Sequence, residues 1–170
     1  MHRLIAGAAV LALTLFTTPA GAGAPQPARP APATMYTGRW YQIARIAPAD
    51  PHPCHAATDD FTPAKTGGFA VTIACRDNAG KLKRMSVKGE IVPGSGGAKF
   101  RVAFLGGLFH QEYWVLDHAV DNTWALMATP AGHYVWLLSR TPVLTAGGPM
   151  AVAQAVRSLG YDPARMAPDR

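Results

Sequence analysis

The stretch Gly38-Arg39-Trp40-Tyr41-Gln42-Ile43-Ala44-Arg45 opens the folded part of the chain and decides how the rest is interpreted. Alternate residues share a face: Trp40, Gln42, Ala44 and the following Ile46 lie on one side, and Tyr41, Ile43 and Arg45 lie on the other. A period of two residues is typical of a β-strand with one buried face. The stretch therefore predicts a strand whose Trp40 side lies toward a core.

The same two-residue period recurs toward the C-terminus in segments 56–61, 69–73, 85–91, 99–104, 113–116, 124–129 and 134–139. Turns rich in glycine, proline and asparagine separate these segments, so neighbouring strands should be antiparallel. Eight such strands can close into a barrel that leaves no exposed edge. The predicted fold is all-β, an eight-stranded antiparallel up-and-down barrel, with a two-sheet sandwich as the structural alternative.

After the last strand the period of the apolar residues changes. Val152, Ala155, Val156 and Leu159 recur at helical spacing, residues 145–149 resemble a helix start, and Gly160 can end the helix. An amphipathic helix must bury its apolar stripe against another element. We therefore expect one C-terminal helix packed on the outside of the barrel.

The N-terminus has the form of a secretory signal. A basic start precedes an apolar run from Leu4 to Phe16, and small residues end at a predicted cut after Ala22. An uncleaved anchor is the alternative. The predicted domains are a signal peptide over 1–22, a flexible Pro/Ala-rich lead-in over 23–34 and a barrel over 35–170. No cysteine stands directly after the apolar run, where a lipoprotein anchor would be attached. We therefore expect a soluble periplasmic or secreted protein without such an anchor.

The charge pattern bears on partners. The net charge is +6, but the basic residues are scattered, and only Lys81–Arg84 form a small cluster at an expected turn. Nucleic-acid-binding proteins usually concentrate charge on one element, so no nucleic-acid partner is expected. A weak contact with an anionic membrane surface and ordinary surface solubility are the two interpretations of this charge.

Three motifs in order resemble the lipocalin family: the opening Gly-Arg-Trp-Tyr stretch, Asp117 before a turn, and Trp136-Leu137-Leu138-Ser139-Arg140-Thr141-Pro142. Within the family the chain is most similar to bacterial lipocalins and apolipoprotein D. The resemblance implies a barrel that holds a small apolar molecule. It also implies structural roles for Gly38, Trp40, Asp117 and Arg140, with the Arg140 guanidinium packed across the Trp40 indole. One departure is Gln42, where the family usually has an acidic residue.

The only two cysteines, Cys54 and Cys75, are expected to pair. Cysteines of secreted proteins usually form disulfides, and a hairpin that turns near 65–67 would place position 54 nearly opposite 75. Because His52 and His55 lie close to Cys54, a metal or redox site is the alternative. We expect no metal and no cofactor.

The candidate ligand-binding residues are the aromatic and apolar side chains on the Trp40 side of the barrel. They are Trp136, Tyr134, Leu138, Phe100, Val102, Phe104, Met85, Val87 and Tyr113. Trp136 matches a cavity tryptophan of apolipoprotein D, and the others follow by alternation. Pockets for small ligands are mostly apolar with few polar groups.

No set of residues forms a recognisable catalytic motif. The sequence therefore predicts a carrier of a fatty acid, a lysophospholipid or a similar small hydrophobic ligand in the cell envelope. Two alternatives remain: a lipid-modifying enzyme on the same barrel, and an interaction module whose barrel is filled. The enzyme would need a polar group with a perturbed pKa inside the cavity.

Overall fold

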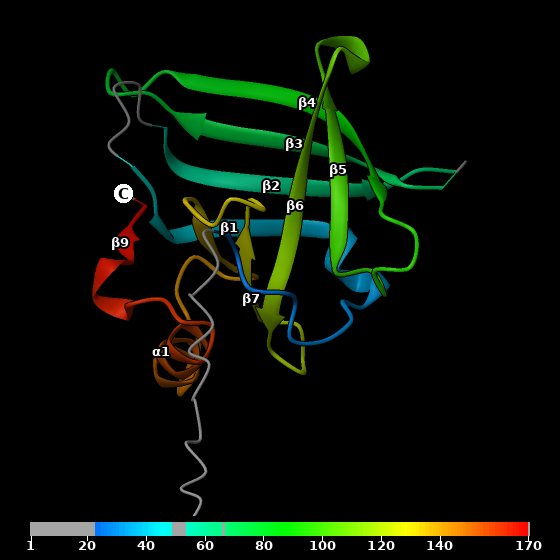
Figure 1. Cartoon of the computed structure of the whole chain (residues 1–170). Coiled ribbons are helices and arrows are strands. Elements are labelled where there is room, and N and C mark those ends of the chain that lie inside the picture. The colour runs from blue at the N-terminus through cyan, green and yellow to red at the C-terminus, as the bar shows by residue number, and fades with distance from the viewer. Residues whose placement is uncertain (1–22, 49–53, 66, 170) are drawn as a thin grey trace, which may run out of the picture.

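The computed structural model describes residues 23–48, 54–65 and 67–169, and the expected signal peptide lies outside them. Within these ranges the chain forms eight long strands and one α-helix (Figure 1). The strands are β1 (Gly38–Ile46), β2 (His55–Pro63), β3 (Phe69–Arg76), β4 (Leu82–Ile91), β5 (Lys99–Phe104), β6 (Phe109–His118), β7 (Trp124–Ala128) and β8 (Val135–Ser139).

The strands pair in sequence order, and every pairing is antiparallel. β8 pairs with β1, and β1 pairs with β2 from Gly38↔Phe61 to Tyr41↔Thr58, so the sheet closes on itself. The predicted up-and-down barrel is therefore confirmed, and the sandwich alternative is wrong. A short ninth strand, β9 (Ala167–Pro168), adds to β1 and was not predicted.

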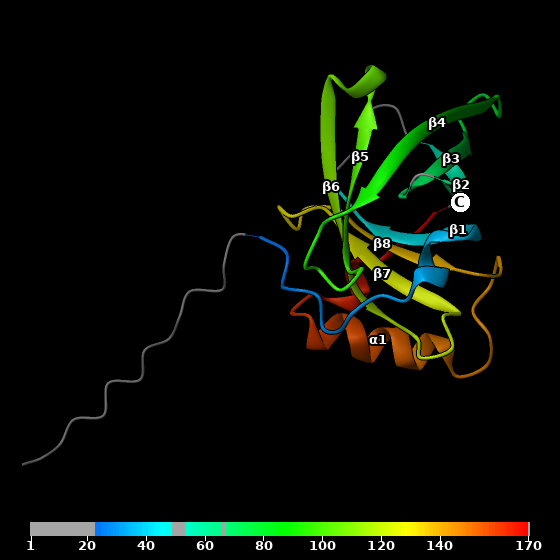
Figure 2. The same cartoon turned by 90° about the vertical axis from the view of Figure 1, so that its right-hand side faces the viewer.

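One end of the barrel is plugged. The short helix η1 (Ala33–Tyr36) crosses this end, and its Met35 and Tyr36 are buried with Trp40. Their neighbours in the plug are Phe61, Phe69 and Phe100, whose rings pack around Tyr36. At the opposite end lie the β3–β4 and β5–β6 turns, which extend beyond the barrel apart from each other (Figure 2). The interior can therefore be reached from one end.

Helix α1 (Gly148–Ser158) packs on the outside of the barrel, as predicted (Figure 2). Its Val152, Ala155 and Val156 are buried against outward-facing residues of β6, β7 and β8 that include Leu116, Leu126 and Leu137. These residues form a second hydrophobic core between α1 and the outer face of the barrel, separate from the core inside it. No helix among the described residues is long and apolar enough to cross a membrane.

A β-bulge changes the predicted faces of β1. The register with β8 shifts between Gln42 and Ala44, so the alternation reverses within the strand. Trp40 faces the interior, but Ile46 packs with the outer core under α1. The expectation that Trp40 and Ile46 share a face is wrong, because a strict period of two does not survive an inserted residue.

The structure also differs from the expected flexible lead-in over 23–34. Main-chain bonds join Ala24 to Pro130, Ala28 to Leu116 and Ala31 to Gly96 over 2.9, 2.8 and 3.1 Å. Arg29 forms an ion pair with Asp117 at 2.7 Å. The segment is anchored by backbone groups and one charge, which its low apolar content did not reveal.

Cys54 and Cys75 form a disulfide, as predicted, with their Cα atoms 5.5 Å apart at the open end of the barrel. The bond links the start of β2 to the end of β3, where the ladder is interrupted between His55 and Thr58. It therefore fastens a stretch that the sheet alone holds loosely. No described cysteine remains free.

We expect thiol titration of the denatured, unreduced protein to detect no free thiol. Reduction before denaturation should then release two thiols per chain, since the sequence contains only two cysteines. Two reactive thiols without reductant would contradict the pairing and reopen the metal interpretation.

Arg140 packs against Trp40 at the plugged end of the barrel. Its guanidinium carbon lies 3.7 Å from the centre of the Trp40 ring. The same group donates to the carbonyl oxygens of Thr37 and Thr34, each at 2.6 Å, while Trp40 Nε1 donates to Met35 at 2.9 Å. The stack and these bonds hold η1 across the barrel end.

Arg140→Lys should lower the free energy of unfolding by about 2 kcal/mol, because an ammonium cannot stack as a plane or bond two carbonyls with a fork. Thermal or urea unfolding measures the change. Arg157→Lys, on the exposed side of α1, is the matched control and should leave stability unchanged. An Arg140→Lys midpoint equal to the parent's would mean that the stack contributes nothing.

Candidate functional site

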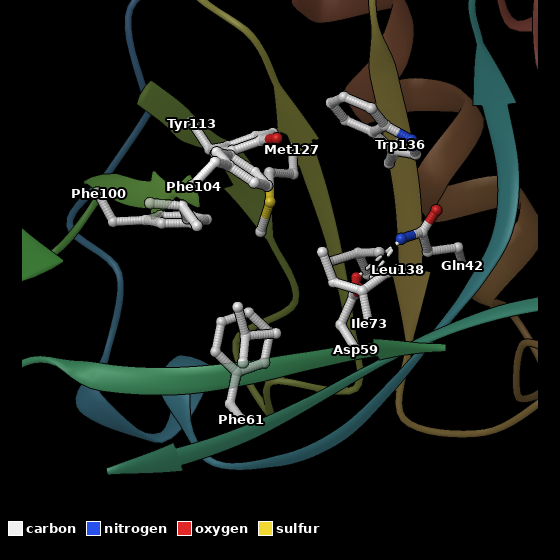
Figure 3. Close-up of a pocket in the computed structure, with 12 residues that line it drawn as sticks. Gln42, Asp59, Phe61, Ile73, Phe100, Phe104, Tyr113, Met127, Trp136 and Leu138 are labelled. Carbon is white, nitrogen blue, oxygen red and sulfur yellow. Dashed lines mark hydrogen bonds between the residues drawn. The ribbon is translucent and has the colours of Figure 1, made fainter. Parts of the chain in front are cut away.

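The barrel encloses a cavity of about 150 Å³ above the plug (Figure 3). Most of its wall is apolar, with aromatic rings on β5, β6 and β8 and aliphatic side chains on β3. The lining residues are Gln42, Asp59, Phe61, Val71, Ile73, Phe100, Val102, Phe104, Tyr113, Met127, Trp136 and Leu138. The cavity draws on seven of the eight barrel strands, and β4 alone adds nothing to it.

Six of the nine candidate ligand-binding residues line this cavity: Phe100, Val102, Phe104, Tyr113, Trp136 and Leu138. Three do not. Val87 is buried inside the barrel but does not border the cavity, and Met85 is 46% exposed at the open end opposite Ile73. Tyr134 is 40% exposed and stacks on Trp136, with ring centres 5.7 Å apart, so it lies beside the cavity wall.

Alternation placed Met85 and Val87 on the correct face of β4 but could not tell how far along the barrel they lie. β4 runs from the exposed β3–β4 hairpin toward the plug. Met85 therefore falls at the open rim, and Val87 falls deeper, in the core of the barrel. Depth along a strand depends on register with its neighbours, and the sequence does not state the register.

Six lining residues were missed by the sequence interpretation: Gln42, Asp59, Phe61, Val71, Ile73 and Met127. Phe61, Val71 and Ile73 follow the two-residue alternation and could have been included. Asp59 lies in the predicted strand segment 56–61, and its pairing with Trp40 at the closure of the barrel puts it on the inward face. An acidic residue between inward-facing Ala57 and Phe61 was the available signal.

Gln42 and Asp59 form the polar spot of the cavity. Gln42 Nε2 donates to Asp59 Oδ1 and Oδ2 over 3.1 and 3.0 Å. The two side chains point toward each other on the side of the cavity opposite Phe100 and Tyr113 (Figure 3). Asp59 is only 8% exposed. Among the described residues no basic side chain forms an ion pair with it.

This environment changes the acidity of Asp59. Burial raises its pKa to about 6, the charges of Asp60 and Asp169 act in the same direction, and the bond from Gln42 opposes them. Burial raises the pKa of Tyr113 to about 12, with a smaller contribution from the Asp59 charge. The phenol thus stays neutral, while the carboxyl titrates close to physiological pH.

Aromatic rings extend from the plug to the open end along one wall. Phe100 stacks on Tyr113 with ring centres 5.4 Å apart, Tyr113 tilts against Trp136 at 5.9 Å, and Trp136 stacks on Tyr134. Ring faces carry partial negative charge and offer large flat apolar contacts. The wall can therefore hold a flat or short apolar body.

The lining includes one carboxyl, one amide and one phenol, but no serine, cysteine, histidine, lysine or arginine. These groups can bind a hydrogen-bond donor. Asp59, whose pKa is raised, is the one carboxyl among them, and the Tyr113 phenol borders the same cavity.

Comparison with known proteins places these observations in context. The family model described as a lipocalin-like domain matches residues 33–169. The outer membrane lipoprotein Blc of Vibrio cholerae is 28% identical over 133 residues, which cover 77% of each chain.

Two solved structures show the same fold. Insecticyanin from the tobacco hornworm Manduca sexta superposes with a TM-score of 0.70 at 18% identity, covering 85% of this chain and 83% of its own. The amine binding protein of Rhodnius prolixus, solved as a tryptamine complex, superposes with a TM-score of 0.61 at 14% identity and covers 84% and 83% of the two chains.

Proposed function

Because this chain belongs to the lipocalin family, we propose that it binds and carries a small hydrophobic ligand inside its barrel. The observation that carries the proposal is the apolar cavity, which is plugged at one end by η1 and the Trp40–Arg140 stack. Burying apolar ligand surface there is favourable, at about 0.8 kcal/mol per methylene. A barrel of this kind needs no reaction to be useful.

The size of the cavity limits what it can hold. About 150 Å³ is the volume of an engineered cavity that binds benzene, and pockets for drug-sized ligands start at about 300 Å³. A fatty acid or lysophospholipid would therefore place only the end of its acyl chain in the cavity and keep its headgroup at the open end. A compact ligand would fit entirely.

Titration of the purified protein with a fluorescent fatty acid and with a lysophospholipid tests the carrier function. Trp136 lines the cavity, so a bound ligand should quench tryptophan emission saturably. The alternative of a filled barrel predicts no saturable change with any apolar probe, and that result would overturn the proposal.

The enzyme alternative is less well supported. The cavity lining places a second acid–base group, the Tyr113 phenol, with Asp59, but no serine, cysteine, histidine or lysine. Binding uses all of the groups that are present.

The open end suggests where the carrier works. Leu105, Leu108 and Phe109 are 72, 79 and 63% exposed at the β5–β6 turn. The β3–β4 turn lies at the same end (Figure 2) and carries Lys81, and Lys83 and Arg84 follow it at the start of β4. We include in the proposal a weak contact of this end with an anionic membrane in the cell envelope. Co-sedimentation with anionic but not with neutral vesicles would support the contact, and equal recovery with both would contradict it.

A further inference from the structure

The Asp59–Gln42 pair is costly for a protein whose cavity only needs to be apolar. A buried carboxylate without a cationic partner destabilises the folded chain, since desolvation is not repaid by one amide donor. A carboxylate has about four acceptor sites, and Gln42 occupies two of them from a single nitrogen. The pair therefore retains capacity for a donor that the described part of the chain does not provide.

The remaining acceptor sites of Asp59 are available on the cavity side, because Asp59 belongs to the cavity lining. Asp59 is nearly buried, it borders the same space as Tyr113 and Trp136, and Gln42 fixes its orientation. Arg39, which lies opposite Asp60 in the β1–β2 ladder, instead binds Asp60 on the outer surface at 2.7 and 2.8 Å. The outer carboxylate is thus neutralised by the chain, and the inner one faces the ligand space.

We infer that Asp59, oriented by Gln42, is a ligand-recognition residue and that the cavity selects compact apolar amines, whose ammonium group binds the carboxylate. This inference rests on the proposed carrier function and refines its ligand class. An ammonium donates up to three hydrogen bonds and pairs with the charge, while the aromatic wall takes the apolar body. A cation near the Tyr113 and Trp136 rings also gains from their negative faces.

The same geometry opposes an acidic headgroup inside the cavity. A ligand carboxylate beside Asp59 would place two like charges in an apolar space, and one of them would have to bind a proton. A fatty acid can occupy the cavity only by its chain end, next to an unpaired carboxylate. An amine of about benzene size would pair with the desolvated Asp59 carboxylate, whereas an acyl chain would leave that carboxylate unpaired.

The polar and charged groups that act on Asp59 come from four parts of the fold. Gln42 on β1 and Tyr113 on β6 border the same cavity, while Asp60 on β2 and Asp169 after β9 act through their charges. Asp60 is paired with Arg39, and Asp169 lies 3.6 Å from Arg45. Since none of these is a histidine or a free cation, a change of amine affinity between pH 5 and 8 would report Asp59 itself. Affinity for an amine should rise as pH increases through about 6, where Asp59 ionises.

The test compares three probes with the same ring and different heads: 2-phenylethylamine, ethylbenzene and 3-phenylpropionate. Calorimetric or competition titration of the purified protein at pH 7.5 should rank them in that order. Asp59→Asn keeps the shape of the side chain and removes its charge. It should weaken the amine by about 10- to 100-fold and leave ethylbenzene unchanged, as expected for one charge-assisted hydrogen bond.

Asp60→Asn is the matched control, because it removes the adjacent but outward carboxylate and its Arg39 pair. It should preserve the ranking of the probes. Equal affinities of the parent protein for amine and carboxylate, with ethylbenzene still bound, would overturn the amine inference and leave the carrier function intact. No binding of any probe or fatty acid would overturn the carrier function.

If Asp59→Asn fails to fold, the pH series of the parent protein gives the answer. Amine affinity that falls at least fivefold from pH 7.5 to pH 5, with constant ethylbenzene affinity, supports recognition by Asp59. Parallel curves for the two probes contradict it.

Discussion

Val102→Asp should abolish saturable ligand binding. Val102 is 3% exposed, lies in the middle of β5 and borders the cavity. A carboxylate at this position would sit in an apolar wall with no cation facing it, and a polar group buried without a partner costs about 2–7 kcal/mol. It would also add a second acid to the space that Asp59 already borders. An apolar ligand would then have to desolvate that charge in order to enter.

The fluorescent fatty acid titration measures this effect, and far-UV circular dichroism shows whether the variant keeps its sheet. Arg101→Gln is a suitable control on the outer face of the same strand. Arg101 lies 4.0 Å from Glu90 and 3.6 Å from Glu112, so an acidic replacement would bring three carboxylates together, whereas glutamine adds no charge. Val102→Asp protein that folds and binds with the parent's affinity would contradict the cavity's location.

The sequence was sufficient to predict the barrel because the same two-residue alternation recurs in many strands. Phe100, Val102 and Phe104 alternate without interruption, and all three line the cavity. The helical stripe around Val152 and Val156 likewise has only the outer wall to cover. Each pattern is local, so it can be recognised before the tertiary arrangement is known.

The polar spot could not be predicted in the same way, because it depends on closure of the barrel. Gln42 and Asp59 belong to β1 and β2, and the β1–β2 pairing brings the two strands together. The bulge after Gln42 further separates its face from that of Ile46. Bulges and closing registers are set by contacts between distant segments, and single-strand alternation does not encode them.

The buried carboxylate should also make the folded chain more stable in mild acid than its other acidic groups would suggest. Burial raises the pKa of Asp59 to about 6 in the folded chain, from the ordinary carboxyl value of 3.8 that holds in the unfolded chain. Between these values the unfolded chain releases a proton that the folded chain keeps, so stability falls as pH rises. The contribution is fully present below about pH 4 and is lost as pH passes through about 6. At about 1.36 kcal/mol per pKa unit, the loss is roughly 3 kcal/mol.

Asp59→Asn isolates this contribution, since an amide does not titrate. We expect urea unfolding to show the variant gaining roughly 3 kcal/mol on the parent between pH 4 and pH 8. Asp60, Asp77 and Asp121 have lowered pKa values, and their stabilisation is lost as pH falls, but they titrate alike in both proteins and cancel in the difference. A pH-independent difference would mean that Asp59 is not buried as the structure places it. A saturating concentration of amine should remove most of the difference in unfolding free energy between the parent and the variant, because it supplies the parent's Asp59 with the missing cation.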